Sequence, residues 1–234
     1  MSAATRYFPT MPKRNTKRGL AAPVEVDMVS DFVCPWCWLG YRQFQRAADK
    51  TKPRPVLSFR PYMLDGTVPA EGLEYRAYMK NKFGDKPDSR WTAMREHLEA
   101  EGPKYGIAFD FKAITRRPNT LAAHRLMRWA QGQGLGEKCA VALFRAYLEH
   151  GEDIGDLDVL AGIAGDIGLD SVLTRELLER DDDAVDVQNE ILFFRGLGIS
   201  GVPTFIYNGQ MAVQGAQTPG VHRKTIADVL ALET

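Results

Sequence analysis

The sequence has few cysteines and lacks long apolar runs. Three cysteines in 234 residues are too few for a disulfide-stapled scaffold and for a closed four-thiolate metal site. No run approaches the roughly 20 apolar residues that span a bilayer. Thirty basic and thirty acidic residues balance, which removes any overall attraction to nucleic acid or anionic membrane. With 44% hydrophobic residues, the composition is that of a globular protein with one large domain, or one domain carrying an insertion.

The first 22 residues differ in charge from the rest of the chain. They hold five basic residues and no acid, so the remainder carries 25 bases and 30 acids. This segment lacks the apolar centre of a secretory signal. We expect residues 1–22 to form a flexible basic tail, with an organelle transit peptide as the alternative because the segment contains Arg and no acid. A cytoplasmic protein is favoured.

The beginning of the chain predicts a strand, a helix and a second strand. Apolar residues alternate and then run together over residues 24–30, as in a strand near the middle of a sheet. After Cys34-Pro35-Trp36-Cys37, apolar residues recur at spacings of three and four up to Ala48, which indicates a helix. Pro35 suits the first turn of that helix, where its missing N–H is not needed. A further strand signal over 56–62 completes a βαβ unit with parallel strands.

The long middle of the chain, about residues 70–197, is predicted to be helical. Asn119 can cap one of its helices, and Asp156 can cap another that Gly168 closes. The acidic run Asp181-Asp182-Asp183 is interpreted as a solvated cap for the last helix of this block.

Strand signals return near the C-terminus. Residues 204–207 and 211–214 flank Asn208-Gly209, which is the strongest two-residue signal for a β-hairpin. Residues 218–232 then have the apolar pattern of a helix. The whole order is βαβ, a helical block and ββα, so we predict an α/β fold.

A Cys-x-x-Cys pair at the junction of a strand and a helix indicates redox chemistry. Free N–H groups and the positive end of the helix dipole stabilise a thiolate at the first cysteine. The two-residue gap lets the second thiol reach the first and close a small disulfide. We therefore predict Cys34 as the attacking sulfur and Cys37 as the resolving sulfur. Trp36 lies between them and is expected to help set exposure and reduction potential.

Half of a zinc site is the alternative interpretation of the cysteine pair. A zinc site needs two further ligands, but Cys139 stands alone and the four histidines form no pair at ligand spacing. We therefore predict no resident metal, and leave open transient binding of soft metals by the dithiol. Cys139 lies among apolar residues and is expected to be buried and inert.

Val202-Pro203-Thr204 is the second element of the predicted site. Proline inside a sheet marks an edge or a special turn, and Pro203 directly precedes an apolar strand. A cis peptide at Pro203 would leave the preceding backbone groups free to pair with an extended peptide. An ordinary turn explains the proline taken alone, whereas its occurrence together with the dithiol favours the first interpretation.

Six stretches of the sequence carry a resemblance to a known family. They are Ser30-Asp31-Phe32-Val33-Cys34-Pro35-Trp36-Cys37, Arg117-Pro118-Asn119-Thr120, Leu143-Phe144-Arg145-Ala146-Tyr147, Asp153-Ile154-Gly155-Asp156, Gly201-Val202-Pro203-Thr204-Phe205 and Val213-Gln214-Gly215-Ala216-Gln217. In these stretches the chain resembles the DsbA-like branch of the thioredoxin superfamily, and within it the FrnE-like proteins. The resemblance covers about residues 24–232, with the motifs in the expected order.

The resemblance implies a thioredoxin fold interrupted by a helical domain. Residues 23–66 and 199–234 would form the thioredoxin-like domain. Residues 67–198 would form an inserted, all-helical domain. The activity implied is that of a thiol–disulfide oxidoreductase or isomerase that passes through a mixed disulfide.

The resemblance also assigns roles to single residues. Cys34 is the nucleophile, Cys37 resolves the mixed disulfide, and Pro203 is a cis-proline facing them. No cofactor is implied besides the redox-active disulfide, with glutathione as a candidate redox partner. The expected substrate is a protein or small molecule that contains a thiol or disulfide, and a homodimer is a candidate assembly. Residues predicted to contact the substrate are Pro35, Trp36, Val202, Thr204 and Gln214.

Three further residues are left with two roles each. Asp31, three residues before Cys34, either tunes that thiol or ends the strand. His124 either lines the cleft between the domains or has a structural role in its helix. Gln217, like Gln214, either contacts the substrate or bonds within a turn.

Two other functions are left open. The wider family includes 2-hydroxychromene-2-carboxylate isomerases and kappa-class glutathione transferases, in which serine typically replaces the first cysteine and glutathione supplies the thiol. Cysteine at both positions argues against that chemistry. The other alternative is a non-enzymatic peptide holdase or soft-metal-binding protein. Pro35-Trp36 also departs from the Pro-His of typical periplasmic DsbA, so an equally strong oxidant is not implied.

Overall fold

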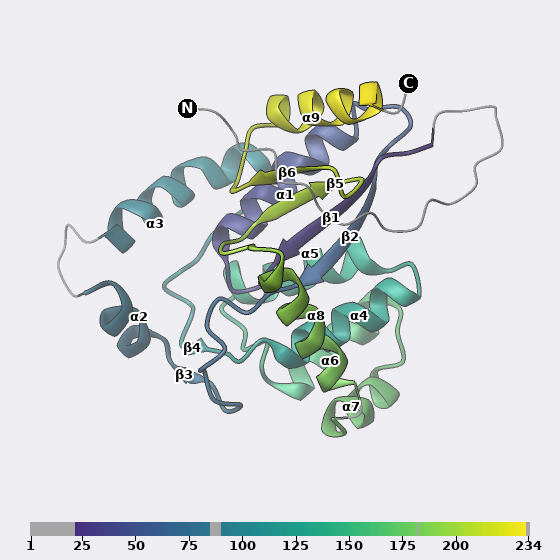
Figure 1. Cartoon of the computed structure of the whole chain (residues 1–234). Coiled ribbons are helices and arrows are strands. Elements are labelled where there is room, and N and C mark those ends of the chain that lie inside the picture. The colour runs from purple at the N-terminus through teal and green to yellow at the C-terminus, as the bar shows by residue number, and fades with distance from the viewer. Residues whose placement is uncertain (1–21, 85–89, 182, 233–234) are drawn as a thin grey trace.

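A four-stranded sheet forms the centre of the protein (Figure 1). The computed structural model describes residues 22–84, 90–181 and 183–232, so the predicted basic tail lies, apart from Ala22, outside the described residues. The strand order in the sheet is β2-β1-β5-β6. Strands β1 and β2 are parallel, and the other two pairings are antiparallel. The strands are β1 Glu25–Ser30, β2 Val56–Pro61, β5 Thr204–Tyr207 and β6 Met211–Gln214.

The two faces of the sheet are covered by different helices. The helix α1 (Pro35–Ala48) and the helix α9 (Pro219–Leu232) pack on the face that carries Met28 and Phe205. The helix α8 (Ala184–Gly196) packs on the opposite face. Since successive residues of a strand point to opposite faces, β1 places Met28 in one core and Val29 in the other, and β5 divides Phe205 and Ile206 in the same way. The predicted βαβ and ββα halves are therefore confirmed as one thioredoxin-like sheet.

The β5–β6 hairpin turns at the predicted dipeptide. Asn208 and Gly209 both have positive φ, 47° and 64°, as a type I′ turn requires. The Asn208 side chain also accepts a hydrogen bond from Glu25 N at 2.7 Å. The turn is thereby joined to the start of β1, and the hairpin prediction is confirmed.

In the described part of the segment between the two halves, the regular structure consists of helices and one short ribbon. Strand β3 pairs with strand β4, and the prediction of an all-helical insertion omitted this ribbon. Two residues per strand are too few for an alternating pattern, so the sequence carried no signal. The elements are β3 Leu73–Glu74, α2 Tyr75–Phe83, α3 Arg90–Glu101, a 3₁₀ turn Gly102–Tyr105, β4 Arg116–Arg117, α4 Leu121–Gly132, α5 Gly136–Leu148, α6 Leu157–Ile167 and α7 Ser171–Glu179.

One hydrophobic core joins the inserted helices to the sheet. It contains Phe44 of α1 and Phe205 of β5 together with Leu126 of α4 and Phe144 of α5. In Figure 1, α2 and α3 lie to one side of the sheet, while α4, α6 and α7 lie below it. The exact limits predicted for the two domains, 66/67 and 198/199, stay predictions.

Two of the three predicted caps need correction or refinement. The Asp156 side chain accepts from Asp158 N at 2.7 Å, which confirms that cap. Thr120 rather than Asn119 occupies the N-cap position of α4, and Asn119 Oδ1 accepts from Leu121 N in the turn before it. Asp183 stands at the N-cap position of α8, but its side chain caps nothing. Its Oδ1 pairs instead with a buried arginine of α4, and Asp182 of the predicted acidic run lies outside the described residues.

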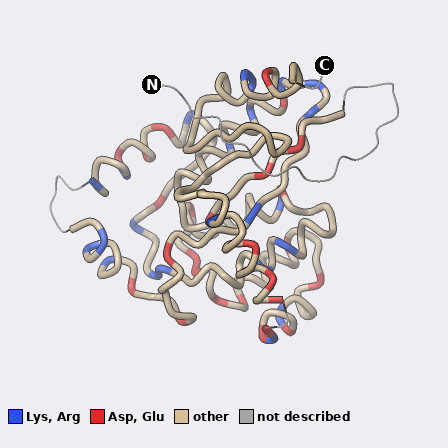
Figure 2. The backbone as a smooth tube through the Cα atoms, viewed as in Figure 1, with Lys and Arg blue, Asp and Glu red and all other residues tan. Residues whose placement is uncertain are grey.

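Charged residues of both signs are spread over the described surface. Figure 2 shows Lys and Arg interspersed with Asp and Glu along the outer helices, and this view has no face of a single sign. Among the described residues, no helix combines the length and apolar character that a bilayer crossing demands.

Candidate active site

The two cysteines of the motif lie at the start of α1. Cys34 is the N-cap residue, with extended backbone angles (φ −92°, ψ 109°), and Pro35 is the first helical residue. Cys34 N donates to Asp31 O at 3.0 Å, and Cys37 N donates to Cys34 O at 2.9 Å. Both thiols are free. Cys34 is 4% exposed and Cys37 is fully buried, so Cys34 is the less buried of the two sulfurs.

The loop before β5 lies against this dithiol, although 168 residues separate Val202 from Cys34. The Val202–Pro203 peptide bond is cis. Cys34 Sγ donates a long hydrogen bond to Val202 O at 3.8 Å. Thr204 Oγ1 donates to Gly201 O at 2.8 Å, which holds the loop in shape. The backbone of the residue before the proline therefore lies next to the Cys34 sulfur.

The other residues predicted to contact a substrate surround this loop. Trp36 and Val202 are half-buried, whereas Pro35 and Thr204 are buried. The exposed Gln214 lies over the loop, since a Cβ added at Gly201 would stand 3.1 Å from Gln214 Nε2. Trp36 and Val202 are therefore partly accessible at the dithiol and Gln214 is exposed over the loop, while the Thr204 hydroxyl is used within the loop.

Gln217 adopts the second of its two predicted roles. Its Nε2 donates to Gln214 O at 3.1 Å. The amide thereby bonds within the turn that follows β6.

Burial and neighbouring charge keep Cys37 protonated. Burial raises the pKa of the Cys37 thiol well above its ordinary value, and the adjacent Cys34 sulfur and the negative charge of Asp31 raise it further. Hydrogen bonding to the Asp31 backbone acts in the opposite direction and does not outweigh them. Since a thiol, unlike a thiolate, is a poor nucleophile, Cys37 stays unreactive until its proton is removed.

Asp31 directly follows the end of β1, and its side chain acts on Cys37, while the predicted tuning of Cys34 stays a prediction. The Asp31 backbone carbonyl closes the turn to Cys34, and its fully buried carboxylate accepts from Leu64 N at 2.8 Å. Burial alone would raise the pKa of Asp31, but His124, the Arg117 charge and the Leu64 N–H together lower it below its ordinary value. Among the described residues, Asp31 Oδ1 has no hydrogen-bond partner. A buried negative charge therefore lies directly behind the dithiol, where it acts on Cys37.

His124 links two elements of the fold next to Asp31. Its Nε2 lies 3.0 Å from Tyr62 O, and because a carbonyl oxygen only accepts, this nitrogen carries the proton. The same nitrogen is 3.7 Å from Asp31 Oδ1, too far for a hydrogen bond. His124 therefore ties α4 to the chain after β2 and places a polar group beside the buried carboxylate.

Arg117 is a member of this group that sequence reasoning missed. The residue is buried, its Nη1 donates to Pro118 O at 2.7 Å, and its guanidinium lies 5.4 Å from the Tyr78 ring centroid. Its charge helps to keep Asp31 ionised. The stretch Arg117-Pro118-Asn119-Thr120 signalled the segment, but no local pattern connects it with Asp31.

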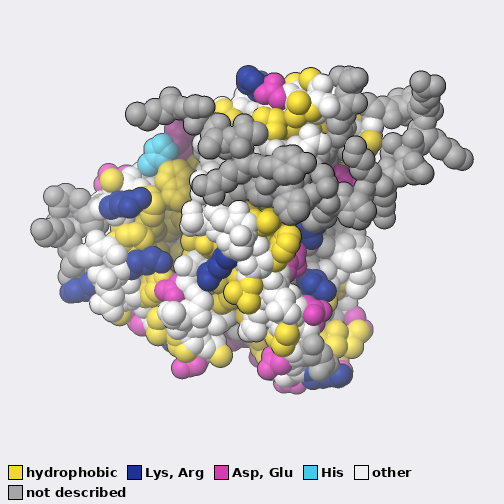
Figure 3. All heavy atoms as spheres, viewed as in Figure 1, with side chains coloured by type: hydrophobic (Ala, Val, Ile, Leu, Met, Phe, Trp, Pro, Cys, Tyr) yellow, Lys and Arg dark blue, Asp and Glu magenta, His cyan; other side chains and the backbone are white. Residues whose placement is uncertain are grey.

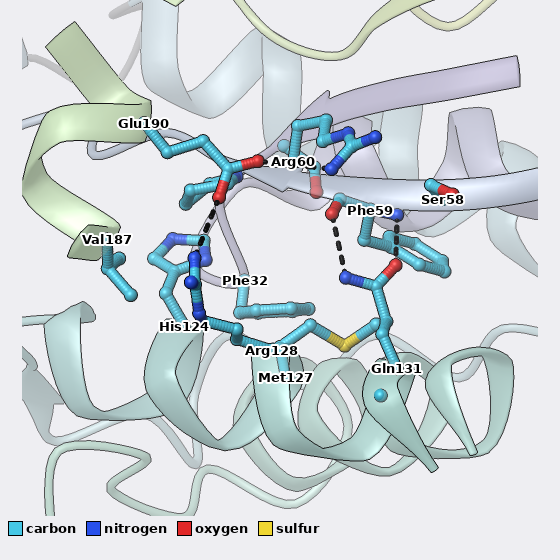
Figure 4. Close-up of a pocket in the computed structure, with 13 residues that line it drawn as sticks. Phe32, Ser58, Phe59, Arg60, His124, Met127, Arg128, Gln131, Val187 and Glu190 are labelled. Carbon is cyan, nitrogen blue, oxygen red and sulfur yellow. Dashed lines mark hydrogen bonds and ion pairs between the residues drawn. The ribbon is translucent and has the colours of Figure 1, made fainter. Parts of the chain in front are cut away.

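A cavity of about 340 Å³ lies between β2, α4 and α8 (Figure 4). Glu190 of α8 bridges Arg60 of β2 at 3.3 Å and Arg128 of α4 at 3.7 Å. On the other side, the Gln131 amide bonds to both Phe59 N and Phe59 O at the free edge of β2. The charged side chains pair with one another, and the Gln131 amide bonds to the backbone of β2. The cavity lining therefore joins β2, α4 and α8 and covers the free edge of the sheet.

Cys139 is buried as predicted. It lies in α5 and is fully buried, and this burial raises the pKa of its thiol to about 12. Within the described residues, no three His, Cys, Asp or Glu side chains are grouped in a way that could hold a metal ion.

A thioredoxin-like sheet with an inserted helical segment and a dithiol at a helix start defines the class of this protein. A family model described as the DSBA-like thioredoxin domain matches residues 25–227. The chain belongs to that family.

Relatives and solved structures agree with this assignment. The uncharacterized protein YwbO of Bacillus subtilis is 28% identical over 207 residues, which cover 88% of this chain and 96% of YwbO. A probable DsbA oxidoreductase from Streptomyces coelicolor has a TM-score of 0.80 at 24% identity, with 89% of this chain and 90% of that chain covered.

Two further solved structures share the fold at lower identity. A 2-hydroxychromene-2-carboxylate isomerase has a TM-score of 0.66 at 14% identity and covers 89% of this chain and 97% of its own. The cytosolic disulfide reductase DsbM from Pseudomonas aeruginosa, in a structure with GSH, has a TM-score of 0.64 at 15% identity. The match covers 88% of this chain and 99% of the DsbM chain. At these identities the likeness concerns the fold alone.

Proposed function

We propose that this protein is a thiol–disulfide oxidoreductase that works through the Cys34–Cys37 pair. The observation that carries the proposal is the position of the Cys34 sulfur. It stands at the N-terminus of α1, 3.8 Å from the backbone oxygen of Val202, with the protonated Cys37 buried behind it. Helix N–H groups favour negative charge at this place, and a second thiol within reach supplies the resolving step.

The exchange has two steps that balance. The Cys34 thiolate attacks one sulfur of a substrate disulfide, forms a mixed disulfide with it, and expels the other sulfur as a thiolate that takes up a proton. Cys37 then loses its proton and attacks the Cys34 sulfur, which closes the Cys34–Cys37 disulfide and releases the second substrate thiol. Two electrons pass from the protein to the substrate. Isomerisation follows instead when a different cysteine thiolate of the substrate attacks the substrate sulfur of the mixed disulfide, which forms a new substrate disulfide and expels the Cys34 thiolate.

The surrounding residues are proposed to hold the substrate during this exchange. Val202, before the cis-proline Pro203, offers its backbone groups to an extended segment of the substrate. Trp36, next to Pro35, and the exposed Gln214 line the approach. Thr204 acts through its bond to Gly201 O, which supports the loop.

Glutathione is the proposed source of electrons when the protein acts as a reductase. Two glutathione thiols reduce the Cys34–Cys37 disulfide and leave as oxidised glutathione, which restores the dithiol. The solved structure of the cytosolic disulfide reductase DsbM with GSH supports this choice of reagent. A cytoplasmic location suits the proposal, because the glutathione pool there keeps thiols reduced.

A glutathione-dependent isomerase or transferase is the second candidate, favoured by the shared fold with a 2-hydroxychromene-2-carboxylate isomerase. Such an enzyme would act on a small aromatic substrate and would not need Cys37. The presence of two thiols in one motif argues for disulfide exchange instead. A non-enzymatic holdase would keep suppressing aggregation after both cysteines are replaced.

Insulin reduction by glutathione, followed by turbidity, tests the proposed function. We expect Cys34→Ser to lose activity completely and Cys37→Ser to accumulate a mixed disulfide at Cys34 that mass spectrometry detects. Cys139→Ser is the matched control and should retain wild-type turnover, because that thiol is buried away from the motif. Unchanged turnover in Cys34→Ser contradicts the proposal, and activity on an aromatic substrate in Cys37→Ser would support the second candidate.

A further inference from the structure

Trp36 occupies an unusual place within the redox motif. It is half-buried, whereas Cys34, Pro35 and Cys37 around it are buried. Its indole contacts the imidazole of His97, with ring centroids 5.5 Å apart and planes inclined by 31°. His97 belongs to α3 of the inserted segment and is exposed. A side chain of the insertion therefore lies against the residue between the two reactive cysteines.

The position of His97 is fixed by its neighbours along the chain. Leu98, the next residue, is fully buried in the main core and anchors α3. The end of the following 3₁₀ turn is held on α1, because Arg42 Nε donates to Tyr105 O at 3.0 Å and the Arg46 guanidinium lies 4.5 Å from the Tyr105 ring centroid. An exposed imidazole on such an anchored helix keeps a defined distance from the motif.

Apolar surface surrounds this contact. Figure 3 shows hydrophobic side chains gathered along α3 on the side toward the middle of the molecule. Trp91 and Met94 of α3 are partly buried and pack against the main core, as does Trp36. An apolar segment of a large substrate can therefore rest on Trp36 while its disulfide reaches Cys34. A small disulfide needs no such support.

We propose that His97 is a positioning residue that holds the Trp36 indole in one orientation beside Cys34 and thereby selects large protein disulfides over small ones. The proposal rests on the proposed disulfide exchange and names its substrate preference. A ring that is already ordered before binding spares the substrate the entropy of ordering it. Loss of the imidazole leaves Trp36 with several orientations, which weakens binding of a protein substrate and uncovers Cys34.

The kinetic test compares His97→Ala with His97→Phe. For insulin, we expect His97→Ala to raise KM about fivefold, roughly 1 kcal/mol, with kcat unchanged. Reduction of a small aromatic disulfide should keep the wild-type KM in both variants. His97→Phe retains a ring against Trp36 and should restore the KM for insulin. His150→Ala is the matched control, since His150 is also exposed and its imidazole faces Glu152 rather than the motif.

A chemical test separates this proposal from the proposed function. Alkylation of Cys34 by iodoacetamide and by a bulky maleimide is followed by peptide mass spectrometry, which needs no disulfide turnover. We expect His97→Ala to raise the maleimide rate severalfold relative to the iodoacetamide rate, and His97→Phe to leave the ratio unchanged. In a Trp36→Ala background, His97→Ala should have no further effect, because the two residues act through one contact.

The outcomes of the two tests are distinct. An unchanged alkylation ratio in His97→Ala, or an equal effect of His97→Ala and His97→Phe, overturns the role of His97. A wild-type protein that reduces no disulfide, but shows the altered alkylation ratio in His97→Ala, contradicts the proposed function and keeps the positioning role.

Discussion

Arg125 of α4 shows how a single buried charge organises the inserted helices. Its side chain is 3% exposed and pairs with Asp183 Oδ1 at 2.6 Å. The guanidinium also donates to the carbonyl oxygens of Leu178, Leu177 and Arg180 at the end of α7. The last carbonyls of a helix lack partners and carry partial negative charge. One arginine therefore caps α7 and joins it to α4 and to the start of α8.

Replacement of this arginine is expected to destabilise the fold strongly. We predict that Arg125→Met lowers the free energy of unfolding by about 3 kcal/mol, because it leaves buried carbonyls and the Asp183 carboxylate without their partner. Urea unfolding followed by circular dichroism measures the change. Arg128→Met is the control on the same helix, and since Arg128 is 46% exposed, its loss should cost less than about 1 kcal/mol. Equal effects of the two substitutions would contradict this account.

At the scale of elements, the packing of α1 against the loop before β5 decides whether the two halves of the site meet. Gly40 lies on the face of α1 toward that loop. A Cβ added there would stand 3.0 Å from Pro203 Cγ and 3.5 Å from Phe205 Cε2. A glycine in a helix costs stability relative to alanine, and here it permits an approach that a methyl group would prevent. Gly40 therefore permits the close packing of α1 against Pro203 and Phe205.

A methyl group at this position should disturb the site. We predict that Gly40→Ala lowers the free energy of unfolding by about 1–2 kcal/mol through overpacking and reduces insulin turnover severalfold as the Pro203 loop shifts. Gly162→Ala in α6 is the control, since nothing lies within 4 Å of a Cβ added there. It should stabilise the protein by about 0.5–1 kcal/mol and leave turnover unchanged. Wild-type turnover in Gly40→Ala would show that the close approach is not required.

At the scale of the whole molecule, a buried histidine joins the C-terminal helix to the sheet. His222 of α9 is fully buried, and its Nδ1 lies 2.5 Å from the Tyr207 hydroxyl of β5. Its ring also meets Phe205 and Phe44 edge-on, with centroids 4.8 and 5.6 Å apart. Burial lowers the pKa of His222 from 6.5 to about 4, because the charged imidazolium loses its hydration. The folded protein therefore keeps this residue neutral.

This histidine should make the fold sensitive to acid. Between about pH 6.5 and pH 4 the unfolded chain takes up a proton at His222 that the folded chain does not, so stability falls as the pH falls. The loss approaches about 3 kcal/mol at pH 4. Thermal unfolding at pH 7 and pH 4.5 measures it, and we expect His222→Gln to lose less stability over that interval than the wild type. His150→Gln, at a histidine 59% exposed, should behave as the wild type, and parallel losses in all three proteins would rule out His222 as the cause.

The sequence by itself determined the features that depend on neighbours along the chain. The βαβ and ββα order followed from apolar periodicity, and the hairpin at Asn208-Gly209 followed from the need for two positive φ angles. The Cys34–Cys37 pair at a helix start followed from the spacing and from Pro35. Each of these rests on backbone geometry within a few residues, which the local sequence specifies.

Only the tertiary structure decided which distant residues meet. It placed Val202 beside Cys34 and the buried carboxylate of Asp31 behind Cys37. It also brought His97 into contact with Trp36. Asp183 pairs with Arg125 and does not form the helix cap predicted for it. The sequence around one residue of such a pair does not indicate the other residue, because the packing of whole helices and strands sets the distance between the two. Burial then alters the chemistry, since a charge removed from water depends on the partners that the fold supplies.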